Sequence, residues 1–184
     1  MSKDLAYIRA IAENDTTAFR ELYELYSEKV YNTAISYAKN TQEAEEITQD
    51  VFVKIHKYAA KFKGESAVST WVYRITVNTS LNFLKKKKRW SIFQSQADHV
   101  EKIEFEHPGV ILEKKEDAKI LMSLLSTLPN SQQTAFILSY IEDLPRQKVA
   151  DIMEVSLKSV ESLLQRAKQN LRTKIKNSSL TEGF

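Results

Sequence analysis

This chain of 184 residues contains no cysteine, only three glycines and only three prolines. Without cysteine it can have neither a disulfide framework nor a thiolate metal site. The scarcity of glycine and proline leaves long uninterrupted stretches rich in Glu, Lys, Leu, Ala and Gln, which favours helix. No apolar run approaches the length of a membrane span, and the first residues lack the apolar segment of a signal peptide, so we expect a cytoplasmic protein.

The chain also lacks the signatures of an enzyme. Its three histidines, His56, His99 and His107, are far apart in the sequence, and no nucleotide-binding glycine loop occurs. The carboxylates fall on the faces of expected helices as ordinary surface charge. We therefore expect no catalytic site, no metal and no cofactor.

Charge is distributed unevenly over a chain whose net charge is +3. Residues 1–91 carry 15 basic and 11 acidic side chains, residues 92–112 carry one and four, and residues 113–184 carry 11 and nine. Helical periodicity fails in the acidic stretch, where Pro108 and Gly109 are adjacent. We predict an all-α fold with two small helical domains, 1–91 and 113–177, joined by a flexible linker at 92–112 and followed by a tail at 178–184. Fully extended, this linker spans about 70 Å.

The first domain is predicted to begin with amphipathic helices. Asp15 or Thr16 caps the first of them, which ends near Asn40, and Thr41 caps the second. The outer side of the second helix is charged, and a charged outer side is usually solvated unless a partner covers it. This outer side consists of Glu46, Gln49, Asp50 and Val53.

The most informative stretch is a predicted continuous helix from Thr70 to Trp90, after a loop at 61–66 that contains Gly64. Beside its apolar stripe lie side chains that can hydrogen-bond base edges or phosphates, or stack on an unpaired base. These side chains are Tyr73, Arg74, Asn78 and Asn82. The five cations Lys85–Arg89 repel one another by about a few tenths of a kcal/mol per pair, which favours a polyanionic partner. A buried Trp71 followed by a solvated basic tail is the alternative interpretation.

The C-terminal domain begins with a leucine seam that stops at Pro129, after which Asn130 and Gln133 predict a capping box. A short helix after Pro145, a break at residues 154–155 and a longer helix capped by Ser156 form the pattern of a helix-turn-helix. Outward positions on the longer helix can contact base edges and phosphates, although helical hairpins are common and the motif alone leaves DNA binding open. These positions are Lys158, Ser159, Glu161, Ser162, Gln165, Arg166 and Lys168.

Together these segments resemble the bacterial extracytoplasmic-function (group IV) sigma factors. The first domain is similar to their region 2 through AFRELYELYSEKVYNTA, EAEEITQDVFVKIHKY and FKGESAVSTWVYRITVN. The last domain is similar to their region 4 through YIEDLPRQKVADIMEVSLKSVESLLQRAKQNLR. The resemblance implies a factor that binds core RNA polymerase and directs it to promoter DNA. It also implies an anti-sigma factor as a partner, no membrane insertion, and a monomer when the protein is free.

The resemblance further implies roles for individual residues. The outer side of the second helix, Glu46, Gln49, Asp50 and Val53, is implied to dock on the core enzyme, and we name it the polymerase face. The last long helix is implied to read the minus-thirty-five element with Lys158, Ser159, Glu161, Ser162, Gln165 and Arg166. The residues implied to meet the minus-ten element are Lys63, Gly64, Glu65, Ser66, Trp71, Arg74, Asn78, Lys85, Lys86, Lys87, Lys88 and Arg89. Three positions depart from the family pattern, because Glu154 stands where a glycine is frequent, and Glu161 and Leu163 stand where a basic residue is frequent.

Two other classes of function stay open from the residues themselves. One is a stand-alone helix-turn-helix regulator whose N-terminal helices dimerise or sense a ligand. The other is a protein-interaction module in which the basic run is a solvated face. The polymerase face distinguishes the sigma-factor hypothesis from the stand-alone regulator, because a stand-alone regulator has no use for such a surface.

Overall fold

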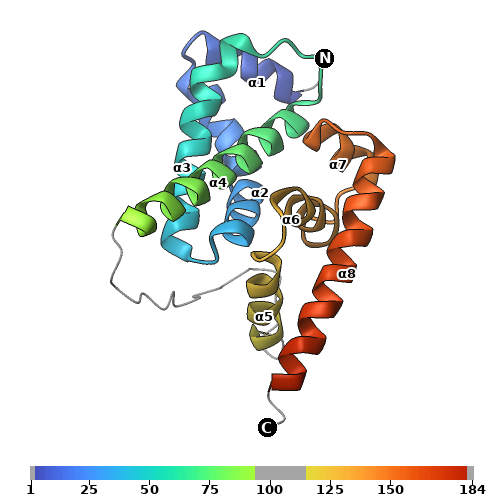
Figure 1. The fold of residues 1–184 in the computed structure, drawn as a ribbon. Coiled ribbons are helices and arrows are strands. Elements are labelled where there is room, and N and C mark those ends of the chain that lie inside the picture. Colours follow the sequence, from blue (N-terminus) through green and yellow to red (C-terminus); the bar gives the residue numbers. More distant parts are fainter. Residues whose placement is uncertain (1–2, 94–114, 182–184) are drawn as a thin grey trace. The chain divides into compact units, whose positions relative to one another are not determined.

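The computed structural model describes residues 3–93 and 115–181. Those residues form α-helices and short helical turns with no strand, which confirms the all-α prediction (Figure 1). The chain divides into two compact units, residues 1–107 and 108–184. Of the predicted linker only residues 92 and 93 are described, and residues 182–184 of the predicted tail lie outside the described range, so the predicted domain boundaries stay predictions. No helix within the described ranges is both long and apolar enough to cross a membrane.

Unit 1 is a bundle of four α-helices. They are α1 (Lys3–Ala12), α2 (Thr16–Ala38), α3 (Thr41–Tyr58) and α4 (Val68–Phe93), with the 3-10 turn η1 (Ala59–Lys61) after α3. Helices α2, α3 and α4 pack against one another, and α1 packs against α2 and η1. The core side chains come from all four helices and include Ile8, Leu22, Val30, Ile47, Val51, Ile55 and Val72. The sequence analysis did not identify α1. It ended the predicted helix that corresponds to α4 at Trp90, three residues before the observed end at Phe93.

Side-chain caps fix where α2 and α3 begin. The Asp15 carboxylate accepts hydrogen bonds from the amides of Thr17 and Ala18 at 2.8 and 3.0 Å, as the sequence predicted. The cap of α3 is Asn40, whose side-chain oxygen accepts from the Glu43 amide at 3.0 Å. The prediction that Thr41 is this cap was wrong by one residue. Asn40 has the extended backbone that a cap requires, while Thr41 is already helical.

A buried hydrogen bond ties α1 to α2. The Tyr26 hydroxyl donates to the Asp4 carboxylate at 2.6 Å, and the residue is only 3% exposed. Burial, and then the bond to Asp4, raise the pKa of Tyr26 above its ordinary value. The tyrosine therefore stays protonated in the folded state at any pH near neutrality.

We predict that Tyr26→Phe lowers the free energy of unfolding by about 1–2 kcal/mol at pH 7, because Asp4 then loses its donor. A group with a raised folded-state pKa stabilises fully below its unfolded pKa, and that contribution is lost as the pH rises past about 10. Urea unfolding at pH 7 and above pH 10 measures the difference. Tyr7→Phe removes a longer, half-buried bond to Glu21 at 3.3 Å and serves as the control, with a smaller effect. An equal effect of the two variants would contradict the assignment.

Unit 2 contains α5 (Lys115–Leu125), α6 (Asn130–Phe136), the π-helical turn η3 (Ile137–Ile141), α7 (Arg146–Met153) and α8 (Leu157–Thr181). Helices α5, α6 and α7 all pack against α8. Its core includes Leu125, Leu128, Ile137, Leu138, Val149, Ile152, Val160, Leu164, Ala167 and Leu171. The predicted helix-turn-helix is confirmed as α7, a short turn and α8.

The turn of this motif depends on two residues. Glu154 adopts a left-handed conformation with φ 56° and ψ 42°, which explains why glycine suits this position in relatives of the resembled family. The Ser156 hydroxyl then accepts a hydrogen bond from the Ser159 amide at 3.2 Å and caps α8, as predicted.

The predicted capping box at Asn130 is wrong. Asn130 is the first residue of α6, and the preceding Pro129 occupies the cap position without a side-chain bond. The Pro129 carbonyl accepts hydrogen bonds from the amides of Gln132 and Gln133 at 2.9 and 3.0 Å. The Gln133 amide that a capping box needs is therefore already bonded, and the Gln133 side chain is buried.

Candidate functional site

The polymerase face forms one exposed stripe along α3. Glu46, Gln49, Asp50 and Val53 are all exposed, and their spacing of three, four and seven residues places them on one side of the helix. Ile47, Val51 and Ile55 are buried on the opposite side. Val53 is 64% exposed, which places an apolar side chain among three polar ones on this face. The structure thus brings the four residues together, and their role stays a prediction.

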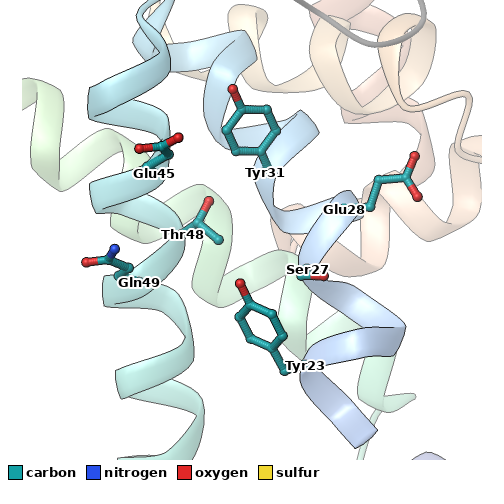
Figure 2. Close-up of a pocket in the computed structure, with 7 residues that line it drawn as sticks. All are labelled: Tyr23, Ser27, Glu28, Tyr31, Glu45, Thr48 and Gln49. Carbon is teal, nitrogen blue, oxygen red and sulfur yellow. The ribbon is translucent and has the colours of Figure 1, made fainter. Parts of the chain in front are cut away.

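A groove between α2 and α3 extends this face. Its volume is about 510 Å³, and it is lined by Tyr23, Ser27, Glu28 and Tyr31 from α2 and by Glu45, Thr48 and Gln49 from α3. Figure 2 shows the two tyrosine rings between the helices, with Gln49 at the α3 side. Gln49 belongs to both the groove and the polymerase face. Aromatic rings beside two carboxylates favour a cationic side chain from a partner.

The sequence analysis did not find this groove, because Tyr23 falls at the apolar spacing of α2, next to Leu22 and three residues before Tyr26. Tyr23 is instead 45% exposed. It packs on Phe52 with ring centroids 4.6 Å apart. A tyrosine at a helical core spacing carries no signal that distinguishes a buried ring from one at the rim of a groove.

The loop between η1 and α4 exposes Lys63, Gly64 and Glu65 and leaves Ser66 half-exposed. Gly64 has a left-handed φ of 76°, and an added Cβ would meet nothing within 4 Å. The glycine is therefore required by the backbone conformation and not by crowding. The loop consequently turns sharply in open space, where a ligand can approach it.

Trp71 anchors this loop at the start of α4. Its ring packs on Phe62 with centroids 4.8 Å apart, and its amide donates to the Ala67 carbonyl at 3.1 Å. Trp71 is half-exposed. Trp71 is therefore not fully buried, and its implied contact with the minus-ten element stays a prediction.

Farther along α4, Asn78 and Asn82 are exposed and Arg74 is half-exposed, but Tyr73 is only 6% exposed. The expectation that Tyr73 meets nucleic acid is therefore wrong. Both α2 and α3 pack against α4, so the buried part of this helix is wider than one apolar stripe. Two of its buried hydroxyls are paired within the helix, since Thr76 donates to the Val72 carbonyl and Ser80 to the Thr76 carbonyl, both at 2.9 Å.

The basic run at the end of α4 is not uniform. Lys85, Lys86, Lys88 and Arg89 are exposed. Lys87 is half-buried, and its ammonium nitrogen lies 2.7 Å from a carboxylate oxygen of Glu43 on α3. The second oxygen of Glu43 is buried without a hydrogen bond, so Lys87 is the charge that compensates this carboxylate.

In unit 2, the predicted recognition surface lies on α8. Lys158, Glu161, Gln165 and Arg166 are exposed, while Ser159 and Ser162 are half-exposed. Ser159 also takes part in the helix cap, since its hydroxyl lies 2.8 Å from that of Ser156. The structure therefore places all six predicted residues on the accessible side of α8 or at its edge.

The sequence analysis missed a cationic cluster in unit 2. The Tyr140 ring lies close to Arg146 of α7 and to Lys168 of α8, at 4.6 and 4.7 Å from the ring centroid. A hydrogen bond from Lys168, followed by the charge of Arg146, lowers the pKa of the Tyr140 hydroxyl. The three residues are distant in the sequence, and only Lys168 was named among the outward positions.

Two family models match the chain, one in each unit. Residues 22–90 match Sigma-70 region 2, and residues 118–171 match Sigma-70 region 4. The first match contains α3, the loop after η1 and most of α4, and the second contains the helix-turn-helix. A stand-alone regulator would not share the region 2 helices, so that alternative is not favoured.

Known proteins agree with these matches over nearly the whole chain. The chain is 25% identical to the ECF RNA polymerase sigma factor SigW of Bacillus subtilis, covering 92% of this chain and 95% of the relative. It is 27% identical to the ECF RNA polymerase sigma-E factor of Escherichia coli K12, covering 94% of each. Among solved structures, the sigma factor RpoE in complex with the anti-sigma factor NepR from Bartonella quintana shares the fold. The TM-score is 0.66 at 21% identity, over 86% of this chain and 96% of that one. The chain belongs to the sigma-70 family as an RNA polymerase sigma factor of the extracytoplasmic-function type.

Proposed function

We propose that this sigma factor docks on core RNA polymerase through α3 and presents two separate DNA-binding surfaces to one promoter. Unit 1 captures the melted minus-ten strand, and unit 2 reads the minus-thirty-five duplex. The observation that carries this proposal is where the exposed polar surfaces of α3, α4 and α8 lie relative to the two family matches. Each exposed polar surface lies inside the family match that corresponds to its role.

The chemistry of α3 supports docking of a protein. The polymerase face combines an exposed Val53 with carboxylates at Glu46 and Asp50, and it continues into a tyrosine-lined groove. Apolar and aromatic anchors surrounded by charge are typical of protein interfaces. The partner surface should therefore be cationic, with an apolar group opposite Val53.

The loop and α4 support strand opening. Separating base pairs costs stacking and pairing energy, which a site offsets if it stacks and hydrogen-bonds an extruded base. The loop around Gly64 is open to a ligand, Trp71 braces its end, and Asn78 presents an amide in the solvent-exposed part of α4. Lys85, Lys86, Lys88 and Arg89 then follow the phosphates.

We predict that Lys87 contributes less to DNA binding than its neighbours, because it is paired with Glu43. Lys86→Gln should lower the salt slope of promoter binding by about 0.7–0.9 if its ammonium contacts one phosphate. Lys87→Gln should lower it by clearly less, and should instead reduce stability. Binding measured from low to moderate salt, with urea unfolding alongside, compares the two variants. Equal slopes in both would contradict the pairing.

Further features of the proposal follow from the sigma-factor family. The protein acts as a non-enzymatic initiation factor, in the cytoplasm where RNA polymerase works, and is a monomer when free. An anti-sigma factor that covers the DNA- and polymerase-facing surfaces would hold it inactive, by analogy with the RpoE–NepR complex.

Binding to core polymerase tests the proposal directly. The chain has no cysteine, so Ser131→Cys on the exposed surface of α6 creates a unique site for a fluorophore. Titration with purified core enzyme should give saturable binding with one protein per polymerase. Absence of binding at micromolar polymerase would contradict the proposal.

A further inference from the structure

A cation cluster in unit 2 contains one of the outward positions of α8, Lys168, together with two residues to which no role has been given, Tyr140 and Arg146. Tyr140, 40% exposed in the turn η3, has the guanidinium carbon of Arg146 at 4.6 Å and the ammonium nitrogen of Lys168 at 4.7 Å from its ring centroid. The Phe136 ring packs beside Tyr140, with centroids 4.9 Å apart. Three elements, η3, α7 and α8, thus hold two positive charges against one aromatic ring.

Stability alone does not account for this cluster. The ring attracts each cation, but the two cations repel one another. The Arg146 Nη1 donor is also buried with no hydrogen-bond partner, which destabilises the folded state. An anion at the cluster would neutralise the repulsion between the two cations.

The hydroxyl of Tyr140 adds a donor to the same place. The hydroxyl can donate its proton to a ligand, and the neighbouring cations, Lys168 first and Arg146 next, lower its pKa. The ammonium group of Lys168 keeps further N–H donors as well. Donors from a tyrosine, a lysine and an arginine therefore converge at one exposed ring.

The cluster is in register with the recognition surface of α8. Glu161, Gln165 and Lys168 are spaced by four and three residues and lie along one stripe of the helix. Lys168 is about 10 Å beyond Glu161 along the axis, which is close to the major-groove width of about 12 Å. With Glu161 at the bases, Lys168 reaches the phosphates at the edge of the groove. Arg146 begins α7, the first helix of the motif, which in such motifs crosses the backbone.

We propose that Tyr140, Arg146 and Lys168 form a phosphate-binding site that takes a single backbone phosphate at the edge of the duplex read by α8. This inference rests on the proposed reading of duplex DNA by unit 2. The register with α8 selects a phosphodiester of the duplex over a free phosphate ion.

The salt dependence of duplex binding by the full chain on core polymerase tests the site. Arg146→Gln and Lys168→Gln should each weaken binding about tenfold and lower the salt slope by about one. The double variant should also lose about one unit of slope, because both cations hold the same phosphate. Tyr140→Phe keeps the ring and should lose about threefold. Lys119→Gln, an exposed cation on α5, is the control and should change nothing.

Duplexes with one neutral methylphosphonate linkage locate the phosphate. When the neutral linkage replaces the phosphate that this site binds, the wild type should bind that duplex as weakly as Lys168→Gln binds the unmodified one. Lys168→Gln should bind the modified and the unmodified duplex equally. Inorganic phosphate that competes more strongly than chloride at matched ionic strength would overturn the duplex assignment. An unchanged slope for the exposed Lys168→Gln, or two units lost in the double variant, would overturn the site. If the wild type retains sequence preference in those cases, the proposed function stands and only this inference fails. If the wild type shows no preference among duplexes, the proposed function itself fails.

Discussion

Asp50→Arg is expected to weaken binding to core RNA polymerase by about 30-fold to 1,000-fold, which corresponds to about 2–4 kcal/mol. Asp50 lies in the middle of the polymerase face, with Glu46 one turn before it and Val53 one turn after it. A cationic partner that approaches this stripe would meet repulsion where it now meets attraction, and like charges brought together at an interface cost several kcal/mol. The titration with labelled protein measures the loss.

The fold should survive this substitution, because Asp50 is exposed and no side-chain bond to it holds α3 in place. Glu13→Lys provides a matched charge reversal in the turn after α1, on an exposed residue of the same unit outside the polymerase face. It should change core binding by less than about twofold. Equal affinity of Asp50→Arg and the wild type, at unchanged helix content, would remove α3 as the docking surface.

Asn78→Ala is expected to slow promoter opening by about 10-fold to 100-fold while leaving duplex binding at the minus-thirty-five element unchanged. The amide of Asn78 is exposed on α4, where it can bond only to a partner that comes to it. If that partner is an unpaired base, its contribution appears only after the strands separate. Opening rates followed with a fluorescent base analogue in the minus-ten element, together with duplex anisotropy, separate the two steps.

Gln42→Ala is a suitable control for Asn78→Ala, since it removes an exposed amide from the first turn of α3 in the same unit. It should leave both opening and duplex binding unchanged. If Asn78→Ala impaired promoter opening and duplex binding equally, the assignment of these two steps to different units would be contradicted. A normal opening rate in Asn78→Ala would contradict it as well.

The parts of the fold that the sequence predicted are those set by local chemistry. The apolar spacing along α2, α3, α4 and α8 specified helices, and the Asp15 and Ser156 caps specified where two of them begin. The break at Glu154 specified the helix-turn-helix. Local chemistry also explains the errors at Thr41 and Asn130. In each case the neighbouring residue, Asn40 or Pro129, occupies the cap position.

The features that the sequence did not predict depend on side chains from different helices. Glu43 and Lys87 pair between α3 and α4 although 44 residues separate them. Tyr140, Arg146 and Lys168 meet only because η3, α7 and α8 pack together. Tyr73 and Tyr23 show the same limit, because one tyrosine is buried and the other is at a groove. The periodicity of apolar residues along one helix does not show how much of the helix surface its neighbouring helices cover.

Run-off transcription from a pooled promoter library is the most direct test of the account. Purified core enzyme would be incubated with the library, with and without this protein, and the transcripts would be sequenced. We predict that transcripts appear only with the protein, and that they are enriched for one minus-thirty-five and one minus-ten sequence at a fixed spacing. Transcription that is the same with and without the protein, from the same promoters, would contradict the central claim.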